Sequence, residues 1–241
     1  MNAIINKNIS ITDLGYIDFK EAWDYQTTLF ERALAVKTEN RSRLEHDRLS
    51  TENHLLFCQH PHVYTLGKSG KENNLLLNQE GLSSVNASYY HINRGGDITY
   101  HGPGQLVGYL VIDLENFFTD IHKYMRYLEE AVIQTLAELN LNSGRIQGLT
   151  GVWVDIDKRP RKICAMGVKT SRWITMHGFA LNVNPDLTYF NHIVPCGISD
   201  KAVTSLQVEL GREVQVKEVQ EILQDKITTL FEMNLNVSHD S

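Results

Sequence analysis

The sequence predicts an α/β (α+β) fold in a single domain, a mixed β-sheet flanked by helices. Short apolar runs typical of strands recur along the chain, whereas helical periodicity is confined to a few separate stretches. The 241 residues contain no internal repeat, no low-complexity tract and no linker rich in Pro, Gly or Ser. We therefore expect residues 1–241 to form one domain.

The N-terminal region predicts a strand at Ile9–Leu14, followed by a helix. Asp18 is the expected N-cap, because apolar residues follow it at helical spacing and Glu21 lies three places on. Residues 37–52 are charged and lack apolar periodicity, so we expect an exposed loop or helix extension there.

The middle of the chain predicts mainly strands. Shorter ones are expected at His54–Cys58, Val63–Leu66, Tyr89–Asn93 and Ile98–Tyr100. Leu106–Leu114 is a longer apolar run, expected to be buried on both faces.

Asp120 is the expected cap of a second helix, which Asn142-Ser143-Gly144 should end. The remaining elements are expected as strands at Gly151–Ile156, Lys162–Thr170 and Ile174–Val183, an irregular stretch at Asp186–Val194, and a last helix at Lys217–Met233.

Composition excludes several classes of protein. The 23 basic and 29 acidic residues give a formal charge of −6, which argues against a general nucleic-acid binder. Three cysteines without zinc-type spacing indicate a reducing compartment. The N-terminus lacks the features of a secretory signal, and no apolar run approaches the roughly 18 residues of a membrane span. We expect a cytoplasmic protein that binds neither nucleic acid nor membrane.

Arg94–Tyr109 is the most unusual stretch, with five glycines and one proline among charged and hydrogen-bonding residues. Such density indicates backbone that approaches a ligand closely or adopts positive φ. Arg94 can fix an anionic or carbonyl end of a ligand, and His101 can exchange a proton. An ordinary glycine-rich hairpin with a surface arginine is the alternative.

Cys196 and Lys162 are the candidate catalytic residues. Cys196 lies in a Pro-Cys-Gly turn, where a thiol can face a cleft; the alternative is a small residue in a buried corner. Lys162 begins an apolar strand and either marks where that strand leaves the core or points into a pocket. In a pocket it can act as a base and lower the pKa of a thiol. Cys164 ranks second as nucleophile because a strand places it on the face of Lys162.

The ten histidines do not indicate a metal site, since no His/Cys cluster has structural-zinc spacing and Pro61 separates the one close pair, His60 and His62. His60, His101 and His177 are more plausible as hydrogen-bonding residues of a pocket. The full Walker-type pattern Gly-x-x-x-x-Gly-Lys-Ser/Thr is absent, and so is a dinucleotide fingerprint. We expect neither metal nor cofactor.

Taken together, these segments resemble the lipoyl(octanoyl) transferases, the lipoate–protein ligase B family. The resemblance covers about Leu14 to Phe231. Its most specific part is Arg94–Tyr109, reinforced by Lys162–Gly167, Trp173–Val183 and Asn191–Ile198, with His60-Pro61 and Thr65–Gly67 also fitting.

The resemblance implies the fold shared with biotin and lipoate protein ligases, and an acyl transfer without ATP. Cys196 would form a thioester with an octanoyl group and Lys162 would act as acid/base. The substrate-binding residues it implies are Arg94, Gly95, Gly96, Asp97, Ile98, Thr99, Tyr100, His101, Ala165, Met166, Gly167, Gly178, Phe179, Ala180 and His60.

The implied donor is octanoyl-acyl carrier protein, and the implied acceptors are lipoyl domains of 2-oxoacid dehydrogenase complexes and the glycine-cleavage H protein. Acyl carrier protein is acidic, so Lys158, Arg159 and Arg161, or Lys68 and Lys71, are candidates to receive it. The alternatives are an ATP-dependent lipoate or biotin ligase of the same fold, a cysteine hydrolase, and a non-enzymatic protein that binds acyl carrier protein.

Overall fold

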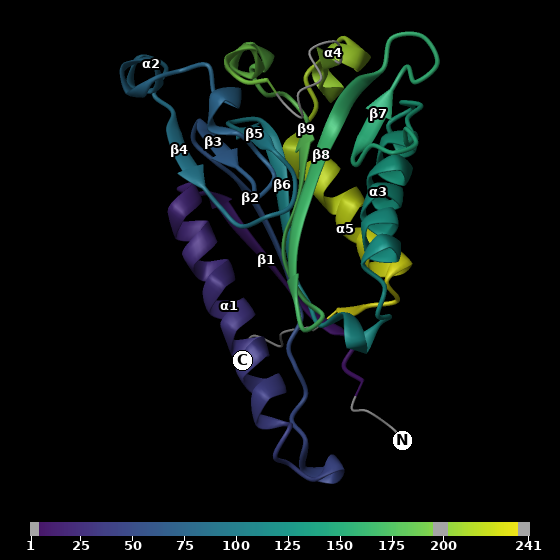
Figure 1. Cartoon of the computed structure of the whole chain (residues 1–241). Helices are drawn as coiled ribbons and strands as arrows, with labels where there is room; N and C mark the ends of the chain where they lie inside the picture. Colours follow the sequence, from purple (N-terminus) through teal and green to yellow (C-terminus); the bar gives the residue numbers. More distant parts are fainter. Residues whose placement is uncertain (1–4, 195–201, 236–241) are drawn as a thin grey trace.

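The structure is a computed structural model, and it describes residues 5–194 and 202–235. Its centre is a mixed sheet in the order β10-β8-β9-β6-β2-β1-β11, with β7 paired to β8 (Figure 1). These strands are β1 (Asn8–Tyr16), β2 (His54–Gln59), β6 (Gln105–Val111), β7 (Val152–Val154), β8 (Arg161–Ser171), β9 (Ile174–Asn182), β10 (Ala202–Val203) and β11 (Asn234–Leu235).

A smaller sheet in the order β4-β3-β5 lies beside the main one. Its strands are β3 (Val63–Leu66), β4 (Ser88–His91) and β5 (Ile98–His101). The helices are α1 (Phe19–Glu39), α2 (Gln79–Ser84), α3 (Ile121–Glu138), α4 (Leu206–Leu210) and α5 (Val216–Leu230), with short 3-10 turns at Glu45–Asp47, Glu72–Asn74, Leu114–Asn116 and Leu187–His192.

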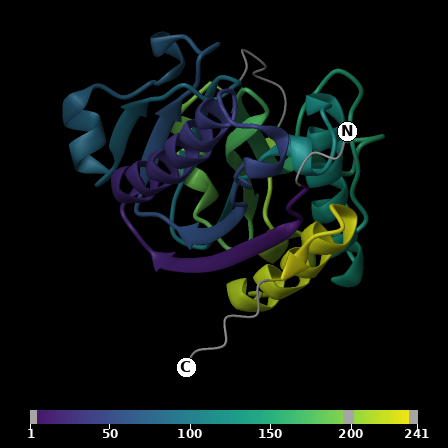
Figure 2. The same cartoon turned by 90° about the horizontal axis from the view of Figure 1, so that it is seen from below.

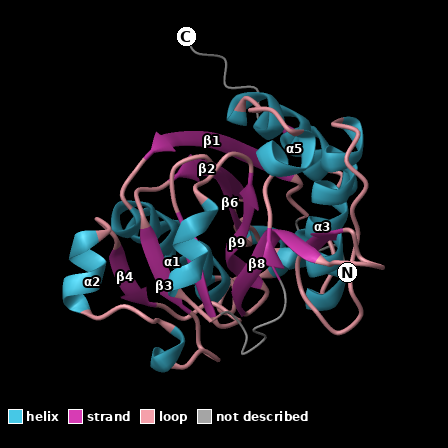
Figure 3. Cartoon of the chain, turned by 90° about the horizontal axis from the view of Figure 1, so that it is seen from above, coloured by secondary structure: helices cyan, strands magenta, loops and turns pink. Residues whose placement is uncertain are grey.

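Helices cover both faces of the main sheet. The view from below shows α1 on one side and the α3–α5 pair on the other (Figure 2), and the view from above shows the small sheet and α2 beside α1 (Figure 3). Leu29, Phe30 and Ala33 of α1 pack on one face of the sheet. Leu128 of α3 and Leu223 of α5 pack on the opposite face. The mixed sheet flanked by helices that the sequence predicts is therefore confirmed.

Both predicted helix caps are present. The Asp18 carboxylate accepts a hydrogen bond from the Lys20 N–H at 2.7 Å, and the Asp120 carboxylate accepts from the N–H groups of His122 and Lys123. Each cap satisfies N–H groups that the first turn of a helix leaves without a partner. The acidic residues before the two apolar periodicities therefore fix where α1 and α3 begin.

The charged segment 37–52 differs in part from the prediction. Lys37 lies in α1, with its side chain only 13% exposed. Its ammonium group pairs with Asp113 at 2.8 Å and Glu115 at 3.0 Å, and donates to the Arg172 carbonyl. Thr51 is also buried, and its hydroxyl donates to Asp113. Local polarity did not reveal these distant partners.

Several short or terminal features also differ from the prediction. Helix α3 ends at Glu138, before Asn142, because Asn140 takes a left-handed φ of 60°. The stretch 186–194 contains a 3-10 turn, and the sequence did not predict α4, β10 or β11, which span five, two and two residues. Such lengths are too short to display a period.

Within the described residues, no helix is long and apolar enough to cross a bilayer.

Candidate active site

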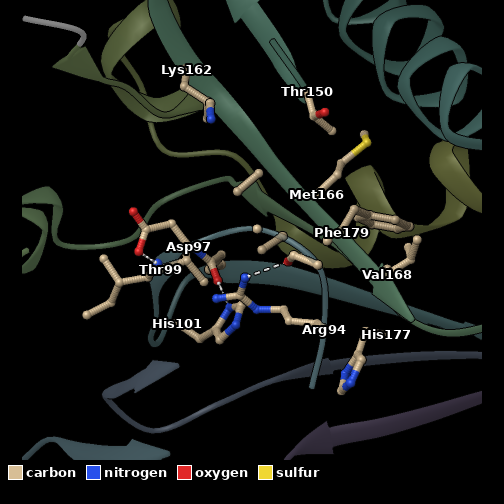
Figure 4. A pocket seen from close by; sticks show the side chains of 18 of the residues that line it. Arg94, Asp97, Thr99, His101, Thr150, Lys162, Met166, Val168, His177 and Phe179 are labelled. Atoms are coloured by element: carbon tan, nitrogen blue, oxygen red, sulfur yellow. Dashed lines mark hydrogen bonds between the residues drawn. The ribbon is translucent and has the colours of Figure 1, made fainter. Parts of the chain in front are cut away.

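A cavity of about 470 Å³ lies where the small sheet meets β8 and β9. Of the predicted site residues, it is lined by Arg94, Gly95, Gly96, Asp97, Ile98, Thr99, His101, Lys162, Ala165, Met166, Gly167, Gly178, Phe179 and Ala180. In Figure 4, β8 passes between the residues of loop 94–97 and the side chains of Met166 and Phe179. Segments far apart in the sequence thus share one cavity.

One side of the cavity, which we call the glycine slot, is lined by the small residues Gly95, Ala165, Gly167, Gly178 and Ala180, with Arg94 beside them. A Cβ atom on Gly167 would lie 2.7 Å from the Gly95 carbonyl oxygen and 3.2 Å from Arg94 Cδ. On Gly178 it would lie 2.2 Å from the Gly108 carbonyl oxygen. These glycines allow loop 94–97 and strand β6 to approach the two strands closely.

Arg94 holds this loop against the small sheet. Arg94 is 8% exposed as a residue, and its guanidinium donates to the Thr65 carbonyl at 2.6 Å, to the Thr65 hydroxyl at 3.0 Å and to the Gly95 carbonyl at 3.0 Å. The sequence assigned Arg94 to a ligand; the structure gives it these protein acceptors and also a place in the cavity wall. The positive charge of Arg94 therefore helps to hold the loop that borders the glycine slot in place.

Asp97 links the cavity to a more distant part of the chain. One carboxylate oxygen accepts from the Ile98 N–H, and the other accepts from the Asn74 side-chain amide at 2.7 Å. The Asn74 carbonyl in turn accepts from the Val194 N–H at 2.8 Å. Asp97 thus anchors the chain shortly before the position of Cys196.

His101 ends a buried hydrogen-bond chain whose direction is fixed. The Asn182 amide donates to the Thr204 carbonyl at 2.9 Å, so its oxygen faces Gln105 and accepts from that amide at 2.8 Å. The Gln105 oxygen then accepts from His101 Nδ1 at 2.8 Å. His101 Nδ1 therefore carries the proton, and Nε2 is left as an acceptor.

Burial keeps the two cavity histidines neutral. Desolvation, aided by nearby His60, lowers the pKa of His101 to about 3. Desolvation, aided by the charge of Arg94, lowers the pKa of His177 to about 3. His177 has a positive φ of 65°, and its Nε2 has no hydrogen-bond partner among the described residues. His177 lines the cavity, as the sequence analysis expected.

Among the predicted site residues that the structure describes, Tyr100 and His60 do not line the cavity. The Tyr100 side chain packs with Tyr64 and Ile98 in the core of the small sheet, and its hydroxyl hydrogen-bonds to His62. It points away because side chains alternate along β5 and His101 faces the cavity. His60 is fully buried, donates to the Ile17 carbonyl and accepts from the Tyr109 hydroxyl at 2.7 Å. It therefore supports Tyr109, which lines the cavity.

Lys162 lines the cavity at one end of β8 (Figure 4). Its Nζ lies 4.7 Å from the centre of the Trp153 ring, a cation–π distance. Its carbonyl accepts from the Thr204 N–H at 2.9 Å. The Thr204 hydroxyl donates to Glu209, which also binds Arg161, the residue before Lys162. Of the two alternatives for this lysine, the structure favours the pocket.

The three cysteines have different places. Cys196 lies outside the described residues. Cys164, the second candidate nucleophile, is fully buried in the core beneath α3, and burial raises the pKa of its thiol. Its assignment as a nucleophile is therefore not supported. Cys58 is buried among apolar side chains and next to His60.

The basic residues proposed to receive acyl carrier protein differ in whether their charge is exposed or paired. Arg161 is paired with Asp155 and Glu209, so much of its charge is neutralised within the protein. Lys158, Arg159, Lys68 and Lys71 are exposed. Lys68 belongs to the turn whose N–H groups bind the carbonyls of Arg94 and Gly96. The turn that carries Lys68 therefore lies beside the cavity.

Comparison with known proteins places this site in a family. Residues 18–228 match the lipoyl protein ligase A/B catalytic domain. The chain belongs to this family. An octanoyltransferase of Cytophaga hutchinsonii is 58% identical over 99% of both chains, and one of Flavobacterium johnsoniae is 59% identical over 96% of this chain and all of its own.

A solved structure has the same fold. It is a bipartite lipoate protein ligase from Thermoplasma acidophilum, which is 16% identical, superposes with a TM-score of 0.69 and covers 95% of this chain and 86% of its own. Together with the family match, this similarity confirms the predicted lipoate-ligase fold.

Within this family fold, the cavity includes residues that the sequence analysis did not assign to the site. They are Phe19, Ile92, Gln105, Tyr109, Met125, Gly148, Leu149, Thr150, Trp153, Val168, Asn182, Phe190 and Val203. Six of them, Phe19, Ile92, Tyr109, Met125, Trp153 and Val168, are apolar or aromatic residues in predicted helices or strands, where a core position and a cavity wall have the same sequence pattern. Among the residues that the structure describes, no group of three metal-ligating side chains converges.

Proposed function

We propose that this chain is an octanoyltransferase of the lipoyl protein ligase A/B family. It transfers an octanoyl group to the ε-amine of a protein lysine, a step of lipoate biosynthesis. Relatives named octanoyltransferase, 58–59% identical over almost the whole chain, support this activity. The observation that carries the chemical part of the proposal is Lys162, an amine in the wall of an otherwise largely apolar cavity bounded by glycines.

In the first step, the Cys196 thiolate attacks the carbonyl carbon of octanoyl-acyl carrier protein. A new carbon–sulfur bond forms, and the bond to the carrier sulfur breaks. The carrier thiolate leaves and takes up the proton that Cys196 gave to Lys162. This exchange of one thioester for another is nearly isoenergetic. Both flanks of the segment that holds Cys196 are anchored, Val194 to Asn74 and Thr204 to Lys162.

In the second step, the acceptor lysine amine attacks the acyl-enzyme. Lys162 takes the proton that the amine loses as the amide bond forms, and the Cys196 sulfur leaves as thiolate and is reprotonated from Lys162. Conversion of a thioester to an amide is downhill, so the reaction needs no nucleotide.

The oxyanion of each tetrahedral intermediate needs hydrogen-bond donors. We assign this role to backbone N–H groups near Cys196 and around Ala165–Gly167. Beyond Cys164, the edge of β8 opposite β9 has no strand partner among the described residues. Because N–H groups alternate between the two edges of a strand, at least one N–H in Ala165–Gly167 points to that open edge.

The donor in this proposal is octanoyl-acyl carrier protein, and the acceptors are lipoyl domains of 2-oxoacid dehydrogenase complexes and the glycine-cleavage H protein. Exposed Lys68 and Lys71 are better placed than Arg161 to receive an acidic carrier, because Arg161 is paired with internal carboxylates.

Intact-mass analysis after mixing the protein with octanoyl-acyl carrier protein tests the proposal. We expect one octanoyl adduct that forms without ATP, is removed by hydroxylamine and is absent in Cys196→Ala. Addition of a lipoyl domain should move the octanoyl group to that domain. An adenylate formed from ATP and lipoate, with no adduct, would instead identify an ATP-dependent ligase, and release of free octanoate would identify a hydrolase.

A further inference from the structure

The cavity passes around the open edge of β8. Ala165, Met166, Gly167 and Val168 are consecutive in this strand, and all of them line the cavity. Side chains alternate between the two faces of a strand, so Gly167 and Met166 lie on opposite faces of β8. The cavity is lined by Gly95 on the side of Gly167 and by Met125 and Phe179 on the side of Met166, and Figure 4 shows labelled lining residues on both sides of the strand.

The packing of neighbouring residues confirms the two faces. Gly167 faces Arg94 and Gly95, in the glycine slot. Ala165 pairs with Ala180, which packs in the cluster beneath α1. Met166 pairs with Phe179, which packs in the cluster beneath α3 and α5. Because paired residues of antiparallel strands share a face, the cavity has one lobe on each side of the sheet.

The second lobe, which we call the methionine lobe, is lined by Met125, Leu149, Met166, Val168 and Phe179. All five side chains are apolar. Methionine is unbranched and flexible, so it adapts to chains of different length. At the glycine slot, in contrast, the Gly95 N–H donates to the Val168 carbonyl at 2.9 Å and joins loop 94–97 to β8.

The volume of the cavity also exceeds the need of one short chain. Cavities of roughly 300–1,000 Å³ hold drug-sized ligands, and the 470 Å³ here falls within that range. An octanoyl chain is smaller than such a ligand. The edge of β8 at Ala165–Gly167 has no strand partner on the side opposite β9 among the described residues. A longer chain that fills the glycine slot would pass this edge to reach the methionine lobe.

We propose that the methionine lobe receives the distal carbons of acyl chains longer than octanoyl, so that Met125 and Leu149 set the longest chain the enzyme accepts. This inference rests on the proposed octanoyl transfer. It makes chain-length tolerance a property of the α3 side of the sheet, separate from the glycine slot.

The test compares the wild type with Met125→Trp and Leu149→Phe, which fill the lobe, and with Met125→Leu, a control of similar volume. The readout is the ratio of dodecanoyl to octanoyl transfer from the corresponding acyl carrier proteins. We expect the filled variants to lower this ratio about tenfold or more, since each methylene that loses its apolar site changes binding roughly fourfold. Met125→Leu should keep the wild-type ratio.

Displacement of a fluorescent fatty acid by dodecanoate and octanoate gives a second readout that needs no transfer. Loss of dodecanoate binding alone in Met125→Trp supports the proposal. An unchanged ratio in both filled variants would overturn it. An equal loss of every chain length, with the acyl-enzyme still forming, would assign the lobe to the acceptor lysine. Absence of octanoyl transfer in the wild type would refute the proposed function, while the displacement assay still tests the lobe.

Discussion

At the scale of single residues, Lys162 and Lys169 lie on the same strand but in different surroundings. The Lys162 side chain lines the cavity and lies over Trp153. The Lys169 ammonium lies 4.6 Å from the centre of the Phe30 ring, near α1. Both make a cation–π contact, so a difference between their variants reports the cavity rather than the ring contact.

Lys162→Ala should reduce transfer of octanoyl to a lipoyl domain by about 100-fold or more, the usual cost of losing a general acid–base. Single-turnover transfer, followed by mass spectrometry, measures it. Lys169→Ala is the matched control and should transfer at nearly the wild-type rate. Near-normal transfer by Lys162→Ala would remove this lysine from the mechanism.

Neutral His101 and His177 should make the folded protein sensitive to acid. Their pKa values are about 3 when folded, below the ordinary 6.5. As the pH falls below 6.5, the unfolded chain takes up protons that the folded chain does not, so stability is lost between about pH 6.5 and 3. Urea unfolding at about pH 7 and about pH 5 measures this loss.

His177→Gln should reduce the loss of unfolding free energy over that interval, because one histidine fewer takes up a proton on unfolding. His46 is the control, since its side chain is 75% exposed; His46→Gln should keep the wild-type dependence. Equal pH dependence in all three proteins would show that His177 is not held neutral.

Strand β5 shows which residue roles could be predicted from the sequence and which could not. The motif correctly placed Thr99 and His101 at the cavity, but it included Tyr100, whose side chain points into the small-sheet core. The period-2 alternation of a strand separates these neighbours. The tautomer of His101 was beyond sequence reasoning, because it depends on Asn182 and the Thr204 carbonyl, both distant in the chain.

At the scale of elements, local signals predicted where helices begin and long strands lie. Asp18 and Asp120 cap their helices through side-chain contacts within three residues, so a short window of sequence contains the whole cause. Strand β10 is different. It is two residues long, and the neighbouring Thr204 donates to Glu209, which binds Arg161 of β8, 48 residues before Glu209 in the chain. No local pattern specifies such an element.

Thr204→Val should lower the free energy of unfolding by about 1.5 kcal/mol, the lower end for a hydrogen bond to a charged group. Its buried hydroxyl donates to Glu209. Urea unfolding measures the change. In the control, Thr188→Val removes a hydroxyl that donates to Asp186 at the exposed surface, and it should cost less than about 0.5 kcal/mol. Equal effects would show that the β10 contact does not hold the strand.

At the scale of the whole molecule, the small sheet has its own apolar cluster but few buried residues. Its Thr65 binds Arg94, and Arg94 borders Gly167 of the main sheet. A cluster of this size cannot fold alone. We therefore expect the chain to unfold as one domain.

Urea unfolding followed by far-UV circular dichroism and by tryptophan fluorescence should give coincident transitions. Trp23, Trp153 and Trp173 report α1, β7 and the turn between β8 and β9, respectively. Tryptophan fluorescence therefore reports on elements near the small sheet and on elements of the main sheet. Two separate transitions would show that the small sheet is an independent unit.

The hydrogen-bond chain from Thr204 to His101 begins at a main-chain carbonyl oxygen, which can accept a hydrogen bond but cannot donate one. That single constraint sets the orientation of two amides and one imidazole before any substrate arrives. The entropy of orienting these groups is therefore lost once, during folding, and not again at each catalytic turnover. A ligand with a hydrogen to donate thus meets, in the cavity wall, a His101 whose Nε2 is already unprotonated.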